Sequence, residues 1–158
     1  MIKTMKILLV DDEAEFLDSI SERMRLKGFE PVLANSGDQA IELLKREKVV
    51  AAVVDLKMPG MDGLETIKEL KKIQPELQTL LLTGYGTEKV KEASKALDSG
   101  YFEKGEMGSF WDHIKKLAKQ FETTMAAAGM ATQGDVEDAY KLEHGENGGD
   151  PGDKKPQG

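Results

Sequence analysis

Residues 7–13 read Ile-Leu-Leu-Val-Asp-Asp-Glu, four apolar residues that end abruptly in three acidic ones. A short, continuous apolar run is typical of a strand that is buried on both faces of a sheet. The pattern returns at residues 49–54, where Val-Val-Ala-Ala-Val-Val leads into Asp55. Two buried strands that each run into a carboxylate predict a parallel sheet with acidic groups along one edge.

The first 123 residues alternate between short apolar runs and segments with helical spacing. Besides 6–10 and 49–54, strands are expected at 30–34, at 79–82 before Thr83, and at 101–102 before Lys104. Helices are expected at 14–27, behind the N-cap candidate Ser36, from Leu64 to about Pro75, at 88–97 and at 107–121. This order predicts an α/β fold, a doubly wound five-stranded parallel sheet flanked by five helices.

Composition divides the 158 residues into two parts. Residues 124–158 hold 7 of the 16 glycines, 3 basic and 7 acidic side chains, and no Ile, Phe or Trp. Such a segment cannot bury enough apolar surface to form a core. We therefore expect a folded domain at 1–123 and an acidic, Gly-rich tail at 124–158, whose start can extend the last helix and whose remainder is flexible.

The whole-chain totals argue against several classes of protein. The chain has no cysteine, which excludes a disulfide framework and fits a reducing cytoplasm. Its longest apolar run has six residues, too few to span a membrane, and its N-terminus lacks a signal-peptide pattern. A net charge of -7 argues against a general affinity for nucleic acid. A cytoplasmic protein that binds neither membrane nor nucleic acid directly is expected.

Polar residues follow four of the expected strands, at Asp11 and Asp12, Asp55, Thr83 and Lys104. In open parallel sheets, ligands bind beyond the carboxyl ends of the strands, so these side chains should meet in one crevice. Three carboxylates there repel one another unless a cation joins them, and Mg²⁺, or Mn²⁺ in its place, prefers such oxygen ligands. A carboxylate can also act as a nucleophile toward phosphorus, with Lys104 and Thr83 to stabilise the phosphoryl oxygens.

Four motifs carry a family resemblance: residues 8–13 (Leu-Leu-Val-Asp-Asp-Glu), 55–63 (Asp-Leu-Lys-Met-Pro-Gly-Met-Asp-Gly), 82–87 (Leu-Thr-Gly-Tyr-Gly-Thr) and Lys104. Each is weak alone, but their order on successive strand ends is specific. Together they resemble the receiver domain of bacterial two-component response regulators, over about residues 5–122. The resemblance implies a flavodoxin-like architecture and a stand-alone protein that accepts a phosphoryl group and then switches its protein contacts.

The resemblance also implies a role for each residue at the crevice. Asp55 would be phosphorylated by the phosphohistidine of a sensor kinase or phosphotransfer protein. Asp12 would bind Mg²⁺ directly, Asp11 largely through water, and the backbone carbonyl of Lys57 would complete the protein ligands.

Thr83 and Tyr101 would transmit the signal. Thr83 would bind the phosphoryl oxygens together with Lys104, and movement of Thr83 would let Tyr101, the switch aromatic, rotate inward. A tenfold population shift needs only about 1.4 kcal/mol, which charge-assisted hydrogen bonds to a phosphoryl group can supply.

Two positions depart from the family pattern. Gly105 stands where the family has a proline after a cis peptide bond, so we expect a trans Lys104–Gly105 bond or a looser loop, with Lys104 less firmly aimed. Leu97-Asp98 stands near the family's Gly-Ala. Both changes touch the face formed by the last two helices and the strand between them, through which a homodimer or partner complex would form.

By the same resemblance, Lys57 and Tyr85 would flank the path by which water attacks the acyl phosphate. A long cation and an aromatic ring there predict slow self-dephosphorylation.

Three functions remain open at this stage. The first is the stand-alone receiver, which is no enzyme beyond its own phosphorylation and dephosphorylation. The second is a receiver fragment of a transcription regulator that lacks its DNA-binding output domain, although the acidic tail favours action by protein contact. The third is a Mg²⁺-dependent aspartyl-phosphate phosphohydrolase. Lys57 argues against the third, because that class has an aspartate as general acid two residues after the nucleophile.

Overall fold

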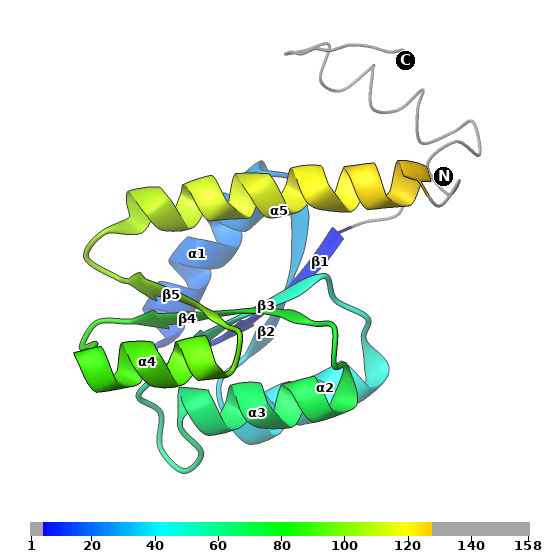
Figure 1. Ribbon diagram of the computed structural model, residues 1–158. Coiled ribbons are helices and arrows are strands. Elements are labelled where there is room, and N and C mark those ends of the chain that lie inside the picture. Colours follow the sequence, from blue (N-terminus) through cyan, green and yellow to red (C-terminus); the bar gives the residue numbers. More distant parts are fainter. Residues whose placement is uncertain (1–4, 128–158) are drawn as a thin grey trace. The chain divides into compact units, whose positions relative to one another are not determined.

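The computed structural model describes residues 5–127, in which strands and helices alternate strictly (Figure 1). The strands are β1 (Met5–Val10), β2 (Phe29–Ala34), β3 (Ala51–Asp55), β4 (Gln78–Thr83) and β5 (Gly100–Glu103). The helices are α1 (Ala14–Leu26), α2 (Gly37–Arg46), α3 (Gly63–Ile73), α4 (Glu88–Ala96) and α5 (Met107–Ala127). The expected order is confirmed. The main differences are that β3 begins at Ala51 and that α5 continues past Phe121 to Ala127.

All strand pairs are parallel, and the sheet order is β2-β1-β3-β4-β5. The order reverses between β1 and β3, which makes their carboxyl ends the point where ligands bind in doubly wound folds. Val10 of β1 pairs with Val54 of β3. Asp11 and Asp55, the next residues on each strand, therefore lie side by side at that point.

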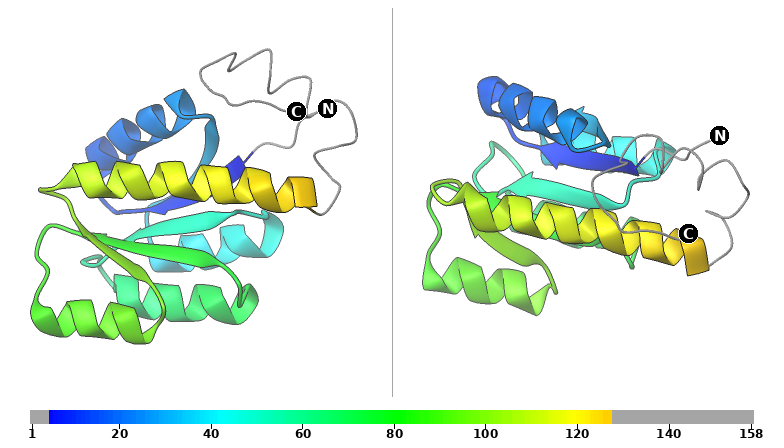
Figure 2. Two further views of the ribbon diagram at one scale, coloured as in Figure 1. Left: turned by 45° about the horizontal axis from the view of Figure 1, so that its top comes forward. Right: turned by 90° about the horizontal axis from the view of Figure 1, so that it is seen from above.

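Helices cover both faces of the sheet (Figures 1 and 2). α2, α3 and α4 lie on one face, where Leu8 and Val10 of β1 join Ile67 and Leu70 of α3 in a core of buried residues. α1 and the start of α5, through Lys115, lie on the other face. Alternate residues of a strand point to opposite faces, so both sides of β1 are apolar. This explains why its sequence is continuously apolar.

The chain divides into two compact units, residues 4–115 and residues 1–3 with 116–158. The first unit holds the sheet, α1 to α4 and the start of α5. In the second, the structure describes the remainder of α5 through Ala127. The expected boundary after Thr123 stays a prediction, and the expectations for the tail from residue 128 onward lie outside the described residues. No helix within residues 5–127 has the length and hydropathy that a bilayer crossing requires.

Asp98, one of the departures from the family pattern, ends α4. Its φ is 57°, a left-handed conformation that glycine usually adopts at this position and that Asp tolerates better than most residues. The N–H of Asp98 donates to the carbonyl of Lys95 and that of Ser99 to the carbonyl of Ser94. These two bonds form a Schellman motif, so α4 ends without the family's glycine.

Candidate functional site

The polar residues that follow β1, β3, β4 and β5 lie at one edge of the sheet, as the parallel register requires. Asp11, Asp55 and Thr83 are almost fully buried, whereas Asp12 is exposed. Lys104 follows β5, and its side chain is 18% exposed. The structure therefore brings together side chains from positions between 11 and 104 of the sequence.

The start of α3 packs directly against the end of β3. A Cβ atom at Gly63 would collide with the backbone carbonyl of Asp55 and would lie 2.8 Å from Cα of Leu56. The N–H of Gly63 donates to the carbonyl of Leu56 at 2.8 Å. Asp62 and Glu65 form a capping box that fixes the first turn of α3. Only glycine permits this close approach, which holds the backbone of Asp55 in place.

The three aspartates form a cluster of oxygen donors. One carboxylate oxygen from each of Asp11, Asp12 and Asp55 lies within 4.8 Å of the others. The pKa of Asp55 is raised to about 6, first by burial and then by the charges of Asp11 and Asp12, against the opposing effect of Lys104. A crowded, partly buried set of oxygen donors fits a hard divalent cation, which would relieve this repulsion.

Lys104 supplies the positive charge nearest to the aspartates. Its Nζ donates to Asp11 Oδ2 at 2.9 Å and to Glu13 Oε1 at 3.1 Å, and lies 3.3 Å from Asp55 Oδ1. Burial alone would lower the pKa of Lys104, but the hydrogen bond to Asp11 and the charges of Asp11 and Asp55 outweigh burial and raise it. All peptide bonds within residues 5–127 are trans, as expected for Lys104–Gly105, and Lys104 still reaches both aspartates.

Thr83 and Tyr101 lie on neighbouring strands. The N–H of Tyr85 donates to Oγ1 of Thr83 at 3.1 Å, so the hydroxyl can still donate its own proton to an oxygen. The hydroxyl of Tyr101 donates to Glu103 at 3.1 Å, and its ring lies so close to Gly86 that a Cβ there would collide with it. The β4–α4 loop that follows Thr83 is thus in direct contact with Tyr101.

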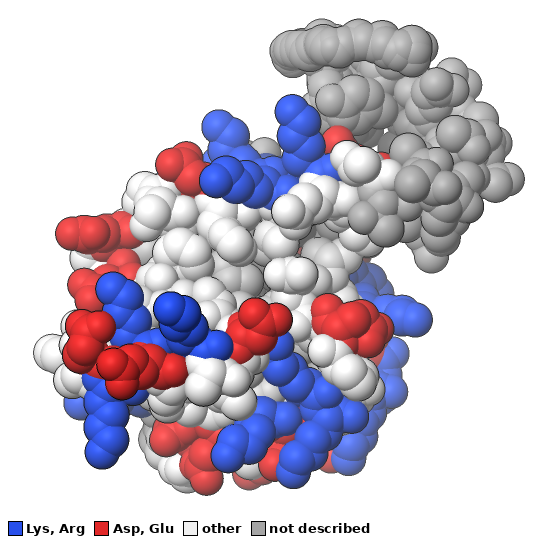
Figure 3. Space-filling view, viewed as in Figure 1, with Lys and Arg blue, Asp and Glu red and all other residues white. Residues whose placement is uncertain are grey.

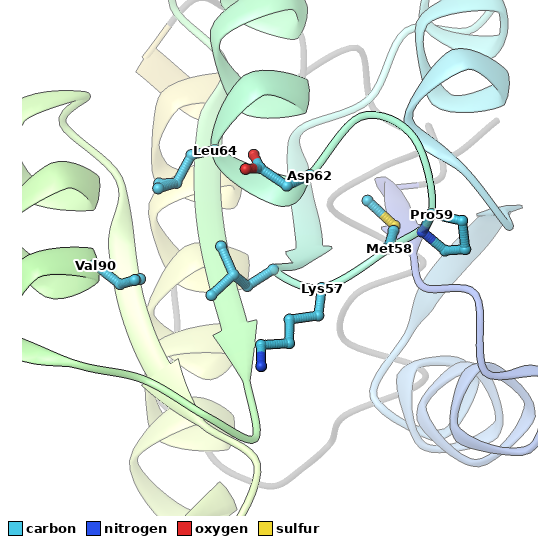
Figure 4. A pocket seen from close by; sticks show the side chains of 7 residues that line it. Lys57, Met58, Pro59, Asp62, Leu64 and Val90 are labelled. Carbon is cyan, nitrogen blue, oxygen red and sulfur yellow. The ribbon is translucent and has the colours of Figure 1, made fainter.

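Lys57 and Tyr85, each two residues beyond the end of its strand, contact each other. The Lys57 Nζ lies 5.0 Å from the centre of the Tyr85 ring, and Tyr85 is 74% exposed. A groove of about 570 Å³ opens beside Lys57, along the loop that follows Asp55 (Figure 4). Its lining is mostly apolar and comes from the loop, α3 and α4: Leu56, Lys57, Met58, Pro59, Asp62, Leu64 and Val90.

Basic side chains gather over α2 and α3 on the face that Figure 3 shows. They are interleaved with acidic ones. Lys45 pairs with Glu42 at 3.2 Å and Lys72 with Glu69 at 2.9 Å. This face therefore carries both signs of charge.

The sequence had indicated the aspartates, Thr83, Lys104 and the Lys57–Tyr85 neighbourhood. It had not indicated the contacts of Lys104 with Glu13 and with Phe16, whose ring centre lies 4.2 Å from Nζ. Glu13 belongs to the acidic run after β1, whereas Phe16 is one apolar residue within the helix expected at 14–27. No local pattern links either residue to Lys104, which lies 91 positions after Glu13.

Comparison with known proteins is consistent with this geometry. The sequence model of one protein family, the response regulator receiver domain, matches residues 7–106. Transcriptional regulatory protein GlrR of Escherichia coli (strain K12) is 35% identical over 100 residues, 63% of this chain and 22% of that protein. Sporulation initiation phosphotransferase F of Bacillus subtilis (strain 168) is 33% identical over 92 residues, 58% of this chain and 74% of that protein. The chain thus spans only 22% of the first regulator but most of the second protein.

Solved structures show the same fold. A CheY-like receiver domain protein from Methanospirillum hungatei JF-1 has a TM-score of 0.70 and 26% identity, covering 77% of this chain and 99% of that chain. The response regulator TrrA of Thermotoga maritima, in complex with Mg²⁺ and BeF, has a TM-score of 0.65 and 27% identity, covering 72% and 99%. TrrA has also been solved with the histidine kinase ThkA, with a TM-score of 0.65, 27% identity and coverage of 72% and 98%.

Proposed function

The chain belongs to the response regulator receiver domain family, and on this basis we propose that it accepts a phosphoryl group on Asp55 in two-component signalling. The observation that carries the proposal is the position of Lys104 Nζ between two buried carboxylates, 2.9 Å from Asp11 and 3.3 Å from Asp55. Stabilising a phosphoryl group on a carboxylate requires positive charge at this point.

The phosphoryl group would come from a phosphohistidine. A carboxylate oxygen of Asp55 attacks phosphorus, the P–N bond to the imidazole breaks, and the leaving nitrogen accepts a proton. The product is an acyl phosphate on Asp55. The product carries more negative charge than the carboxylate did, so it needs Lys104 and a cation to balance it, and Gly63 holds the Asp55 backbone during the transfer.

The aspartate cluster would hold a divalent cation, with Mg²⁺ the best match and Mn²⁺ a substitute. Asp12 and Asp55 would bind it directly, Asp11 largely through water, and the carbonyl of Lys57 would complete the protein ligands. The bound cation would neutralise charge on the carboxylates and on the phosphoryl oxygens. Asp12 is exposed, so this carboxylate can admit a cation from solvent.

Thr83 and Tyr101 would transmit phosphorylation to the surface. The Thr83 hydroxyl would donate to a phosphoryl oxygen, and the β4–α4 loop would follow it because Tyr85 is hydrogen-bonded to that hydroxyl. Tyr101 packs on Gly86 of the same loop, so its ring would move inward as the loop shifts.

A sensor histidine kinase or a phosphotransfer protein would be the donor, and the TrrA–ThkA complex supports such partnering for the family. We propose output through protein contacts, including a homodimer through the α4-β5-α5 face, and no multiple-turnover enzyme activity. The relatives include GlrR, a transcriptional regulatory protein, and sporulation initiation phosphotransferase F. The experiment below therefore also tests the alternative that this chain is part of a transcription regulator.

The deciding experiment is phosphotransfer from purified histidine kinases, and from a small phosphodonor, in the presence of Mg²⁺. Label should appear on the full chain and be absent from Asp55→Asn. Absence of label with every kinase and with the small donor would overturn the proposal. A phosphorylation-dependent affinity for DNA would favour the transcription-regulator alternative.

A further inference from the structure

Four groups surround the ammonium of Lys104, and only two of them belong to the aspartate cluster. Asp11 and Asp55 lie 2.9 Å and 3.3 Å from Nζ. The other two are Glu13, whose Oε1 accepts a hydrogen bond at 3.1 Å, and Phe16, whose ring centre lies 4.2 Å away. We call Glu13 and Phe16 the lysine dock.

The dock differs from the aspartates in what a divalent cation does to it. A cation held by Asp11, Asp12 and Asp55 carries the same sign of charge as the ammonium and competes with it for the negative charge of Asp11. Glu13 lies outside the clustered aspartates. The face of an aromatic ring attracts an ammonium without being a ligand for a hard cation. The dock therefore remains available when Asp11 is lost.

The backbone alone does not aim the Lys104 side chain. Its N–H donates to the carbonyl of Thr83 at 2.9 Å, but the next residue is Gly105, around whose Cβ position the space is open. A lysine side chain is a flexible four-carbon stem, so the position of Nζ must come from contacts at its end. An ammonium has three N–H donors, and Asp11, Glu13 and Asp55 offer one acceptor each.

We propose that Glu13 and Phe16 are positioning residues, which keep Lys104 within reach of Asp55 after a divalent cation displaces its ammonium from Asp11. The inference rests on the proposed function, because it takes the aspartates as the cation site. Glu13 is 67% exposed, so its ion pair with Lys104 adds little to stability. Its role is the placement of Nζ, and its variants are expected to fold as the native protein does.

NMR of the full chain with ¹⁵N-labelled lysine follows the Lys104 ammonium directly, and Lys104→Arg identifies its signal. In the native protein, slow proton exchange is expected both without Mg²⁺ and at saturating Mg²⁺. In Glu13→Gln, exchange stays slow without Mg²⁺, because Asp11 and Asp55 remain. With Mg²⁺ it becomes at least about tenfold faster, the factor for losing one charge-assisted hydrogen bond.

Matched variants separate placement from general electrostatics. Glu15→Gln removes an exposed charge of the same sign two positions away and should behave as the native protein. Phe16→Leu should speed exchange in Mg²⁺, whereas Phe16→Tyr keeps the ring and should not.

Slow exchange of Glu13→Gln in Mg²⁺, or an equal effect of Glu15→Gln, would overturn the lysine dock. The carboxyl signals of Asp11 and Asp55 distinguish this failure from a failure of the proposed function. If Mg²⁺ shifts them and Glu13→Gln stays protected, only the dock is wrong. If Mg²⁺ leaves them unchanged in the native protein, the proposed cation site is wrong and the dock falls with it.

Discussion

Lys6 and Lys104 lie at opposite ends of the sheet, and each contacts carboxylates at hydrogen-bond distance. Lys6, near the start of β1, donates to Glu47 at 2.9 Å, and both side chains are about one-third exposed. Lys104, beyond the end of β5, contacts Asp11 and Asp55, whose side chains are only 4% and 8% exposed. The same two chemical groups therefore meet once beside water and once away from it.

The pKa of the carboxyl group that contacts the lysine is lowered at one end of the sheet and raised at the other. At the amino end, the hydrogen bond and charge of Lys6 lower the pKa of Glu47, and those of Glu47 raise the pKa of Lys6. At the carboxyl end, burial raises the pKa of Asp55 to about 6 even though Lys104 opposes the shift. One positive charge cannot balance the charges of three clustered aspartates, so this end is suited to take up another cation.

The largest expected effect comes from Asp55→Asn. A pKa raised from 3.8 to about 6 destabilises the native protein by at most about 3 kcal/mol at neutral pH. Urea denaturation should therefore find Asp55→Asn more stable above pH 6. The folded native protein binds the Asp55 proton more tightly than the unfolded chain, so it regains stability as the pH falls from about 6 to about 4. A stability difference that stays constant over that range would contradict the prediction.

The next effect is stabilisation by Mg²⁺, which should act at the carboxyl end alone. At ten times its dissociation constant, a cation that binds only the folded state stabilises it by about 1.4 kcal/mol. Thermal denaturation with and without Mg²⁺ should show this gain in the native protein and a much smaller gain in Asp55→Asn. A salt control at equal ionic strength excludes general screening, and equal gains in both proteins would argue against the aspartate cluster as the site.

The Lys57–Tyr85 contact places a second lysine at the carboxyl end, where it would slow the loss of the phosphoryl group. Lys57→Ala and Tyr85→Ala should each speed decay of the phosphorylated protein, by up to about tenfold or about 1.4 kcal/mol of barrier. The decay of label on Asp55 measures this rate. Unchanged decay in both variants would mean that the pair does not restrain water.

Asp98 offers a change at the amino end that leaves the site untouched. Glycine there should stabilise the protein by about 0.5–1 kcal/mol, because a left-handed conformation is strained for any residue with a Cβ atom. The hydrogen bond that the Lys71 ammonium donates to the carbonyl of residue 98 is kept, because it uses only the main chain of residue 98. Urea denaturation of Asp98→Gly beside Asp98→Ala measures the effect, and a gain in the alanine variant as large as in the glycine variant would refute this cause.

The smallest effect is expected from Glu47→Gln. The lowered pKa of Glu47 means that its pair with Lys6 stabilises the fold at neutral pH and stops doing so as the pH falls through the folded-state pKa. The variant should be slightly less stable than the native protein at neutral pH and equal to it in acid. The expected change in stability at neutral pH has the opposite sign to that of Asp55→Asn. If Glu47→Gln proved more stable than the native protein, the contrast between the two ends would be lost.

Much of the fold could be read from local sequence. Continuous apolar runs marked β1 and β3, and Ser36 caps α2 as expected by accepting from the N–H of Gln39. The ends of the strands were less certain, because hydrogen bonding between strands extends or trims them by a residue or two. The sequence places Val50 in β3. In the structure its N–H donates to the carbonyl of Lys6, but the pairing of β1 with β3 begins only at Ile7 and Ala51.

The candidate site was predictable for a geometric reason. In a parallel sheet all strands end at the same edge, so Asp11, Asp55 and Thr83 had to converge once the strands were recognised. What could not be predicted was how the single ammonium of Lys104 is divided among its neighbours. Glu13 and Phe16 contact it because of the way α1 leaves the sheet, and no local pattern encodes that direction.

The alternation of strands and helices, and the identity of the polar residues at the strand ends, follow from local sequence because apolar periodicity and strand-ending side chains are local properties. The pairing of Lys104 with Asp11, Asp55 and Glu13, and the raised pKa of Asp55, follow only from the packed fold. The physical reason is that charge interactions depend on distance and exclusion of water. Both are set by residues far apart in the chain that only the sheet brings together.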